Sequence, residues 1–119
     1  MVRAIRGAIT VENNSAEEIL AATEKMLKAI IDENNLKIDD MISMLFSLTP
    51  DLDAAFPARA ARNMGIVDVP LMCMSEIPID GALEKCVRIL LHVNSDKSLK
   101  EINHVYLGGA VVLRPDLVK

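Results

Sequence analysis

The chain has 119 residues and a formal net charge of −4 at pH 7, because 17 Asp and Glu residues outnumber 13 Lys and Arg residues. Net acidity argues against a surface built to bind nucleic-acid phosphates, and an aromatic content of 3% without Trp leaves few platforms for stacking bases. We expect one domain over residues 1–119, with a core filled by the 51% of hydrophobic residues.

The cysteines and the N-terminal residues predict a reduced, cytoplasmic protein. Cys73 and Cys86 are separated by twelve residues, and neither lies in a Cys-x-x-Cys pair or beside a histidine, so the chain has no zinc-ligand spacing. The first apolar run contains Arg3 and Arg6, which the core of a signal peptide would not carry. No apolar stretch reaches the length of a membrane span. We therefore expect no metal, no membrane and no nucleic acid among its partners.

The chain begins with a pattern that predicts a strand followed by a long helix. Residues 2–11 alternate around small and β-branched residues, which is typical of a strand. Ser15 and Glu18 form a capping-box pattern in front of an apolar series with helical spacing. This series predicts a helix over residues 15–33, which Asn34 helps to stop.

The middle of the chain predicts two strands separated by a short helix. The nearly uncharged residues 41–48 are typical of a buried strand. Pro57 can start a short helix over residues 58–64. The second apolar run, residues 67–77, contains Pro70, which confines the start of a strand there to a strand end or a sheet edge.

The last third of the chain predicts two more strands around a helical turn. In residues 86–93 apolar side chains share one face of a strand, and Arg88 lies on the other face. A second capping-box pattern at residues 98–101 predicts one or two helical turns. Residues 104–113, interrupted by a pair of glycines, form the last predicted strand region.

These elements predict an α/β (α+β) fold in which one long helix covers a five-stranded sheet. One amphipathic helix can cover only part of such a sheet, so an apolar surface remains. In a chain this short, the missing layer is most simply supplied by other copies of the same chain. We therefore predict a homo-oligomer.

The arginines are the most informative charged residues. Arg3, Arg6 and Arg88 lie in predicted strands and Arg114 follows an apolar triplet, whereas the lysines lie in polar or helical surroundings. A guanidinium on a strand is costly unless it has a partner, and its fork matches a carboxylate with two parallel hydrogen bonds. The group therefore indicates a small anionic ligand such as a dicarboxylate.

Each of these residues also has a structural interpretation. The arginines can pair with acidic residues such as Glu76 or Asp116, or extend to solvent from strand ends. We interpret His92 and His104 as satisfied or surface histidines, since neither has the partner spacing of a catalytic base.

The remaining polar candidates are weaker still. Cys73 and Cys86 are typical of inert thiols. Tyr106 is interpreted as a core or rim residue, with a hydroxyl that needs a partner if it is buried. A carboxylate at a strand end, such as Glu76, is often simply solvated.

A series of short runs extends along nearly the whole chain. The runs are residues 6–12, 49–52, 56–62, 69–70, 73–74, 76, 86–88, 104–107 and 111–117. In this order they resemble the monofunctional chorismate mutases of the AroH type. The resemblance implies a homotrimeric pseudo-α/β-barrel built on mixed five-stranded sheets, with active sites in clefts between adjacent subunits. This agrees with the uncovered sheet face inferred above.

The resemblance also implies a reaction, the Claisen rearrangement of chorismate to prephenate on the route to phenylalanine and tyrosine. Because this reaction is pericyclic, it needs no nucleophile, metal, cofactor or proton transfer. An enzyme can select the compact substrate conformer and stabilise the charge that develops as the ether bond breaks.

Roles for individual residues follow from the same resemblance. It implies that Arg88 lies beside the breaking ether oxygen, that Arg6 is a second substrate anchor, and that Glu76 engages the substrate hydroxyl and faces the allylic positive charge. The implied substrate-binding residues are Met72, Cys73, Met74 and Ser75 in the pocket wall, Tyr106 at a carboxylate, Phe56, Arg59 and Arg62 from the neighbouring subunit, and Leu113 and Arg114 near the C-terminal wall.

Three departures from the family pattern are visible. Met72 replaces a smaller hydroxyl residue, so we expect one substrate hydrogen bond to be missing or to come from the backbone. Arg59 stands where Lys also occurs, which keeps the charge and changes its geometry. The chain stops soon after Asp116 and Leu117, where relatives often continue, so we expect weaker closure of the cleft and an effect on substrate capture.

Two alternatives remain open at this point. One is an imine or enamine deaminase of a similarly shaped trimeric family, which also holds a carboxylate with an interface arginine; its usual motifs are not visible here. The other is a trimeric module that binds a carboxylate metabolite without turning it over.

Overall fold

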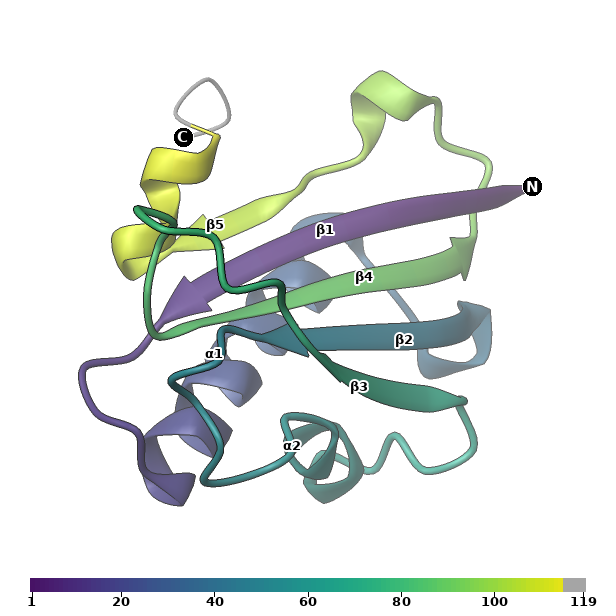
Figure 1. Ribbon diagram of the computed structural model, residues 1–119. Coiled ribbons are helices and arrows are strands. Elements are labelled where there is room, and N and C mark those ends of the chain that lie inside the picture. Colours follow the sequence, from purple (N-terminus) through teal and green to yellow (C-terminus); the bar gives the residue numbers. More distant parts are fainter. Residues whose placement is uncertain (115–119) are drawn as a thin grey trace.

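A computed structural model describes residues 1–114 (Figure 1). Its strands are β1 (Val2–Thr10), β2 (Met41–Leu48), β3 (Leu71–Ser75), β4 (Cys86–Asn94) and β5 (Val105–Leu107), and its α-helices are α1 (Ala16–Asn34) and α2 (Ala58–Asn63). The strands form one sheet in the order β3-β2-β4-β1-β5. The sheet is mixed, because β4 runs antiparallel to β1 and β2 while β3 and β5 run parallel to their neighbours. The predicted fold class is confirmed.

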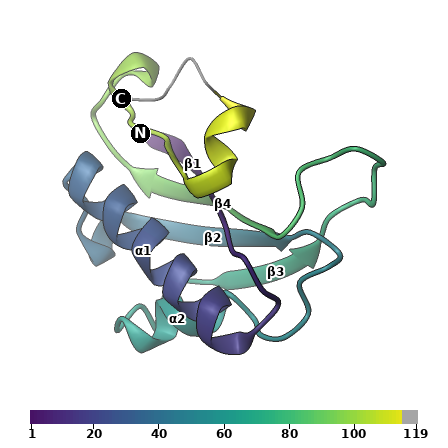
Figure 2. The same cartoon turned by 90° about the vertical axis from the view of Figure 1, so that its left-hand side faces the viewer.

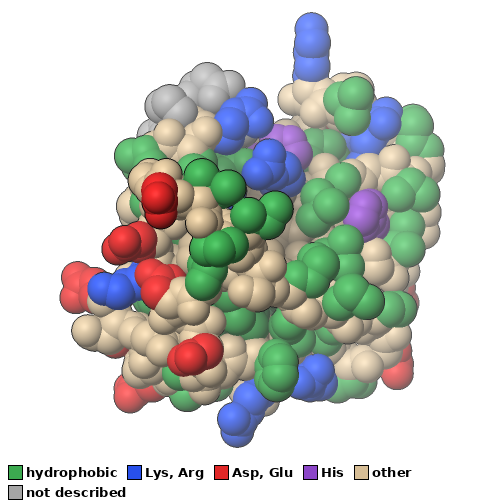
Figure 3. Space-filling model, in the orientation of Figure 1, with side chains coloured by type: hydrophobic (Ala, Val, Ile, Leu, Met, Phe, Trp, Pro, Cys, Tyr) green, Lys and Arg blue, Asp and Glu red, His purple; other side chains and the backbone are tan. Residues whose placement is uncertain are grey.

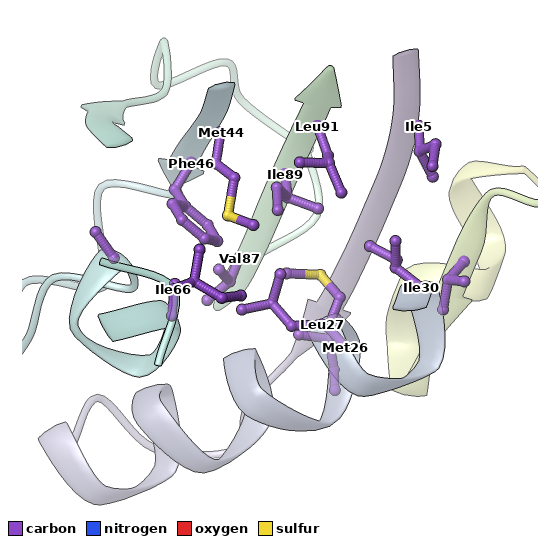
Figure 4. Close-up of a cluster of buried hydrophobic side chains, with 14 of the residues drawn as sticks. Ile5, Met26, Leu27, Ile30, Met44, Phe46, Ile66, Val87, Ile89 and Leu91 are labelled. Carbon is purple, nitrogen blue, oxygen red and sulfur yellow. The ribbon is translucent and has the colours of Figure 1, made fainter. Parts of the chain in front are cut away.

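The core lies between the sheet and the long helix. Figure 2 shows α1 and α2 on one side of the sheet. Side chains from α1, such as Met26 and Ile30, meet Phe46, Ile89 and Leu91 from the central strands (Figure 4), and all five are buried. The predicted alternation along β4 is confirmed from Val87 onward, because the apolar side chains at its odd-numbered positions are buried and those at the even positions from Arg88 to Asn94 are not. The packing therefore fixes which way Arg88 faces.

The start and stop of α1 follow the sequence signals, with one difference. The Ser15 side chain accepts the Glu18 N–H at 3.1 Å, and the helix ends at Asn35 in the left-handed conformation. The Glu18 carboxylate, however, accepts the N–H of Asn13 at 3.1 Å. The capping box predicts an N–H of Ser15 instead, but that group already donates to the Asn13 carbonyl.

The last predicted strand region is shorter than expected. Strand β5 covers only Val105–Leu107, and Gly108–Leu113 forms a 3₁₀ helix. The parallel partner β1 ends at Thr10, so the chain beyond β5 has little left to pair with. Gly108 adopts a positive φ of 58°, and the Gly109 N–H donates to the Thr10 hydroxyl at 2.8 Å. The prediction of a strand to residue 113 was therefore wrong.

Residues 115–119 are outside the described part of the chain. The end of the family-like run, with Asp116 and Leu117, falls there, as does the expectation about closure by a short tail. Within residues 1–114, no helix is both long and apolar enough to cross a membrane.

Gly7 lies where α1 packs tightly against the sheet, and it gives a stability prediction. A Cβ atom at this position would lie 2.8 Å from Cδ1 of Ile30 and 3.0 Å from Cγ2 of Ile89. We expect Gly7→Ala to lower the free energy of unfolding by about 1–3 kcal/mol, because a packed core resists an added methyl group. Urea unfolding of both proteins measures this, and a variant as stable as the wild type would contradict the close packing.

Candidate functional site

The sheet face opposite the long helix carries a row of side chains that includes Arg88. Strand register pairs Arg88 with Ser47 on β2 and with Ala8 on β1, and the row continues to Met74 on β3 and Tyr106 on β5. Paired residues point to the same face, so this row crosses all five strands. Figure 3 shows that apolar side chains cover much of this face, with basic and histidine side chains among them.

Arg88 is held by a carboxylate that arrives from the end of β3. Its Nε lies 3.0 Å from Oε2 of Glu76, and the two side chains are 28% and 19% exposed. The same Glu76 oxygen accepts the Ser47 hydroxyl at 2.6 Å. The Glu76 N–H donates to the Leu48 carbonyl at 2.8 Å, which fixes the residue just beyond the strand. The carboxylate therefore orients the guanidinium from one side.

Two buried polar groups near this pair lack a hydrogen bond within residues 1–114. They are the Nε–H of Arg88, which is close to Glu76 without being aimed at it, and the hydroxyl of Tyr106. Buried polar groups in folded proteins almost always have a partner, and leaving one unpaired costs about 1–3 kcal/mol. A donor-rich position of this kind suits an anion with several acceptor oxygens.

Arg6 lies one row away on the same face. It is the register partner of Leu90, two positions along β4 from Arg88, so Arg6 and Arg88 are diagonal neighbours that can reach one small ligand. Arg3 differs, because alternation turns it toward the opposite face and its Nε donates to the Lys97 carbonyl at 2.8 Å. For Arg3 the structural interpretation is the correct one.

The edge strand β3 presents its residues in two ways. Met72 and Met74 are exposed and share the face of Arg88, whereas Cys73 packs against the core on the other side. The Pro70 carbonyl accepts the Met44 N–H, and the Glu76 N–H donates to the Leu48 carbonyl. The backbone groups of the even-numbered residues of β3 therefore point toward β2. Backbone groups alternate between strand edges, so those of Cys73 and Ser75 lie on the free edge. The Cys73 thiol does not lie in the site.

Three predicted site residues are not brought to Arg88 within one chain. Phe56 precedes α2, and Arg59 and Arg62 lie on α2, on the side of the sheet that carries the helices. All three are exposed, and Phe56 reaches 69%. Within one chain, these three residues therefore lie on the other side of the sheet from the row of Arg88.

The C-terminal candidates lie closer to the site. Leu113 packs with Tyr106 in a small cluster around Ala8 and the buried Cys86. Arg114 follows the 3₁₀ helix and acts electrostatically on His104. Within one chain, Leu113 therefore lies at the end of the row of Arg88 that Tyr106 occupies.

The Cys86 thiol is unreactive although it lies close to the ion pair of Arg88 and Glu76. Burial is the main cause that raises the pKa of its thiol to about 11, and the nearby Arg88 opposes that rise only in part. The thiol therefore stays protonated at neutral pH and offers no nucleophile. This confirms the interpretation of Cys86 as an inert thiol.

Sequence analysis missed the residues that hold the site in place. Thr49 donates its hydroxyl to Oδ1 of Asp51 at 2.5 Å and accepts the Cys86 N–H at 3.0 Å. The Asp51 carboxylate also accepts the Lys85 N–H at 2.9 Å. Together these bonds fix the first residues of β4 just before Arg88. Polar residues directly after the buried strand β2 were the available signal.

A cavity of about 240 Å³ adjoins Glu76, between residues 49–51 and residues 76–84. Its wall includes the carboxyl side chains of Asp51, Glu76, Asp80 and Glu84. An anion is repelled by such a wall, so we assign the ligand to the arginine face instead. Among the described residues, no three or more His, Cys, Asp or Glu side chains are arranged so that they could hold a metal ion.

Comparisons with known proteins agree on one family. The family model described as chorismate mutase type I matches residues 2–117. Chorismate mutase AroH of Bacillus subtilis (strain 168) is 50% identical over 118 residues, which is 98% of this chain and 93% of that protein. Chorismate mutase AroH of Thermus thermophilus is 43% identical over 118 residues, covering 98% and 97%. A solved chorismate mutase from Clostridium thermocellum superimposes with a TM-score of 0.91 at 58% identity, covering 92% of this chain and 98% of that one.

Proposed function

This chain belongs to the type I chorismate mutases, and we propose that it rearranges chorismate to prephenate on the arginine-bearing face of its sheet. The activity is that of an isomerase in aromatic amino acid biosynthesis. The observation that carries the location is Arg88, which is aligned by Glu76 while its Nε–H and the Tyr106 hydroxyl have no hydrogen bond. Family membership argues against the deaminase, and an assay of turnover separates the enzyme from the binding module.

Arg88 is proposed to act on the breaking ether bond. As that bond lengthens, negative charge grows on the ether oxygen, and a cation already fixed beside it stabilises the transition state more than the ground state. Because Glu76 holds the guanidinium in place before substrate arrives, little reorganisation is needed during the reaction.

The other groups are proposed to select the substrate conformer. Arg6 and the Tyr106 hydroxyl bind carboxylate oxygens, and Glu76 accepts the substrate hydroxyl and faces the allylic positive charge. By holding the two ends of chorismate close together, these groups bind its rare compact conformer selectively. Met72 contributes no hydrogen bond, so the free backbone groups of Cys73 and Ser75 are the donors and acceptors available along β3.

The working enzyme is proposed to be a homotrimer, with each cleft formed between two subunits in a pseudo-α/β-barrel. The apolar sheet face is uncovered in one chain, and isolated proteins rarely expose such a surface. A neighbouring subunit would cover it and bring Phe56, Arg59 and Arg62 to the mouth of the cleft. The positive charge of these arginines would offset the net acidity of the chain near the substrate.

Two expectations from the sequence remain proposals. The family match over residues 2–117 supports one chorismate mutase domain over residues 1–119. A reduced, cytoplasmic location is likewise proposed, from the pattern of the two cysteines.

The direct test is to follow the loss of chorismate absorbance with purified protein. Steady turnover to prephenate supports the proposal. Binding of chorismate without turnover would instead support the metabolite-binding module.

We also expect the rate to be insensitive to a metal chelator and nearly flat from about pH 7 to about pH 9. No step uses a metal or a general base. Burial raises the pKa of Cys86 to about 11, so its thiol stays protonated there, and the pKa of His104 is lowered from 6.5, so its ring stays neutral. Rates measured with and without EDTA check this. A loss of activity that added metal restores would contradict it.

A further inference from the structure

We propose that His104 is a positioning residue for the substrate anchor Arg6, and that it can act only while its ring is neutral. This inference rests on the proposed function, because Arg6 matters for capture only if it binds the substrate. The Arg6 backbone N–H donates to Nδ1 of His104 at 2.9 Å. The bond fixes the main chain of the residue whose side chain is to grip a carboxylate.

The position of the ring explains why a side chain makes this bond. Parallel pairing between β1 and β5 begins at Gly7 and Val105. One residue earlier, the imidazole of His104 occupies the place of the carbonyl that a longer β5 would supply. His104 therefore extends the ladder by one hydrogen bond, at the residue that carries the anchor.

This bond dictates the protonation state. Nδ1 can accept a hydrogen bond only with its lone pair free, so the proton of the neutral ring is on Nε2. A protonated imidazole carries N–H groups on both nitrogens and would direct one of them at the Arg6 N–H. Protonation therefore breaks the bond.

The surrounding charges favour the neutral ring. Burial is the largest cause that lowers the pKa of His104, and the positive charges of Arg114 and Arg6 lower it further. On the side of α1, the residue before His104 is held by uncharged groups. The Asn34 side-chain amide donates to the Asn103 carbonyl and accepts the Asn103 N–H. No carboxylate acts on the ring among the described residues. Among the described residues, the charges that act on this ring are both positive, so protonation would place a third positive charge beside them.

The other histidine provides a matched control. Nδ1 of His92 lies 3.1 Å from the Ser43 hydroxyl on the same sheet, and this contact can form with either partner as donor. A change at His92 removes a histidine without touching the Arg6 backbone.

Three variants test the inference: His104→Ala, His104→Asn and His92→Asn. The Asn amide oxygen at residue 104 can accept the Arg6 N–H and does not titrate. We expect His104→Ala to raise KM about 3- to 10-fold, as for the loss of one hydrogen bond, with little change in kcat. We expect His104→Asn and His92→Asn to keep a near wild-type KM. An unchanged KM in His104→Ala, or a KM in His104→Asn as high as in His104→Ala, would overturn the proposal.

A second readout, the amide signal of Arg6 in wild-type protein, does not depend on activity. In wild-type protein the NMR signal of the Arg6 amide should shift as the pH falls through the lowered pKa of His104, and in His104→Asn it should not. KM should rise over the same range at high salt, where the added charge attracts the substrate less. An Arg6 amide that does not follow His104 would contradict the inference. Absence of turnover at every pH would instead contradict the proposed function, and the NMR titration would still decide the hydrogen bond.

Discussion

Replacing Arg88 with Ala should lower kcat by at least about 10²- to 10³-fold, the usual loss for one preorganised donor to a developing oxyanion. A fixed cation in a cleft shielded from water can be worth more than a neutral donor. The loss should exceed any change in KM, because the interaction strengthens as the ether bond breaks. Steady-state kinetics on chorismate measures both constants.

Arg88→Lys separates charge from geometry. Lys keeps one positive charge but cannot hold an ion pair with Glu76 and present a planar fork of donors to the substrate at the same time, so we expect a large loss here as well. Arg3→Lys is the matched control, since Arg3 is a strand arginine bonded to the Lys97 carbonyl and turned away from the site. Near wild-type activity in Arg88→Lys would show that a point charge suffices.

The second large effect concerns the shared cleft. The double variant Arg59→Ala/Arg62→Ala and the single variant Arg88→Ala should each be strongly impaired. When the two are mixed and allowed to exchange subunits, some clefts will combine Arg88 from one chain with both α2 arginines from another. We therefore expect activity to rise above that of either variant alone.

Each variant incubated by itself is the control for that experiment, and light scattering reports the assembly state. If activity does not rise although mass spectrometry shows mixed assemblies, the cleft is not shared. A stable monomer with full activity would contradict the shared cleft as well.

Local signals in the sequence were sufficient for most of the fold. The helix α1 was predictable from Ser15, Glu18 and its apolar spacing, because capping and amphipathicity act within a few residues. The sheet face on which Arg88 lies was predictable for the same reason. Because Val87, Ile89, Leu91 and Val93 of β4 are buried against the core, Arg88 must point to the opposite face. Strand β5 was mispredicted because its length depends on where its partner β1 ends.

The site was predictable in its residue types and less so in its contacts. Arg6, Glu76 and Arg88 were predicted from the sequence and its family resemblance, and the structure pairs Glu76 with Arg88 and places Arg6 on the same sheet face. Arg88 was open to two interpretations, an ion pair within the chain or binding of an anionic ligand. The two are compatible, because the ion pair with Glu76 leaves the Nε–H of Arg88 without a hydrogen bond. The bond from Ser47 to Glu76 depends on the parallel pairing of β2 with β3, which no local pattern specifies.

The account depends most on where the ether oxygen of the substrate meets the protein. A crystal structure with a bicyclic dicarboxylate that imitates the compact transition state tests this directly. We predict that its ether oxygen lies within hydrogen-bond distance of the Arg88 guanidinium, with its carboxylates on Arg6 and Tyr106. An analogue bound with that oxygen away from Arg88, for example in the acidic cavity beside Asp51 and Asp80, would contradict the account.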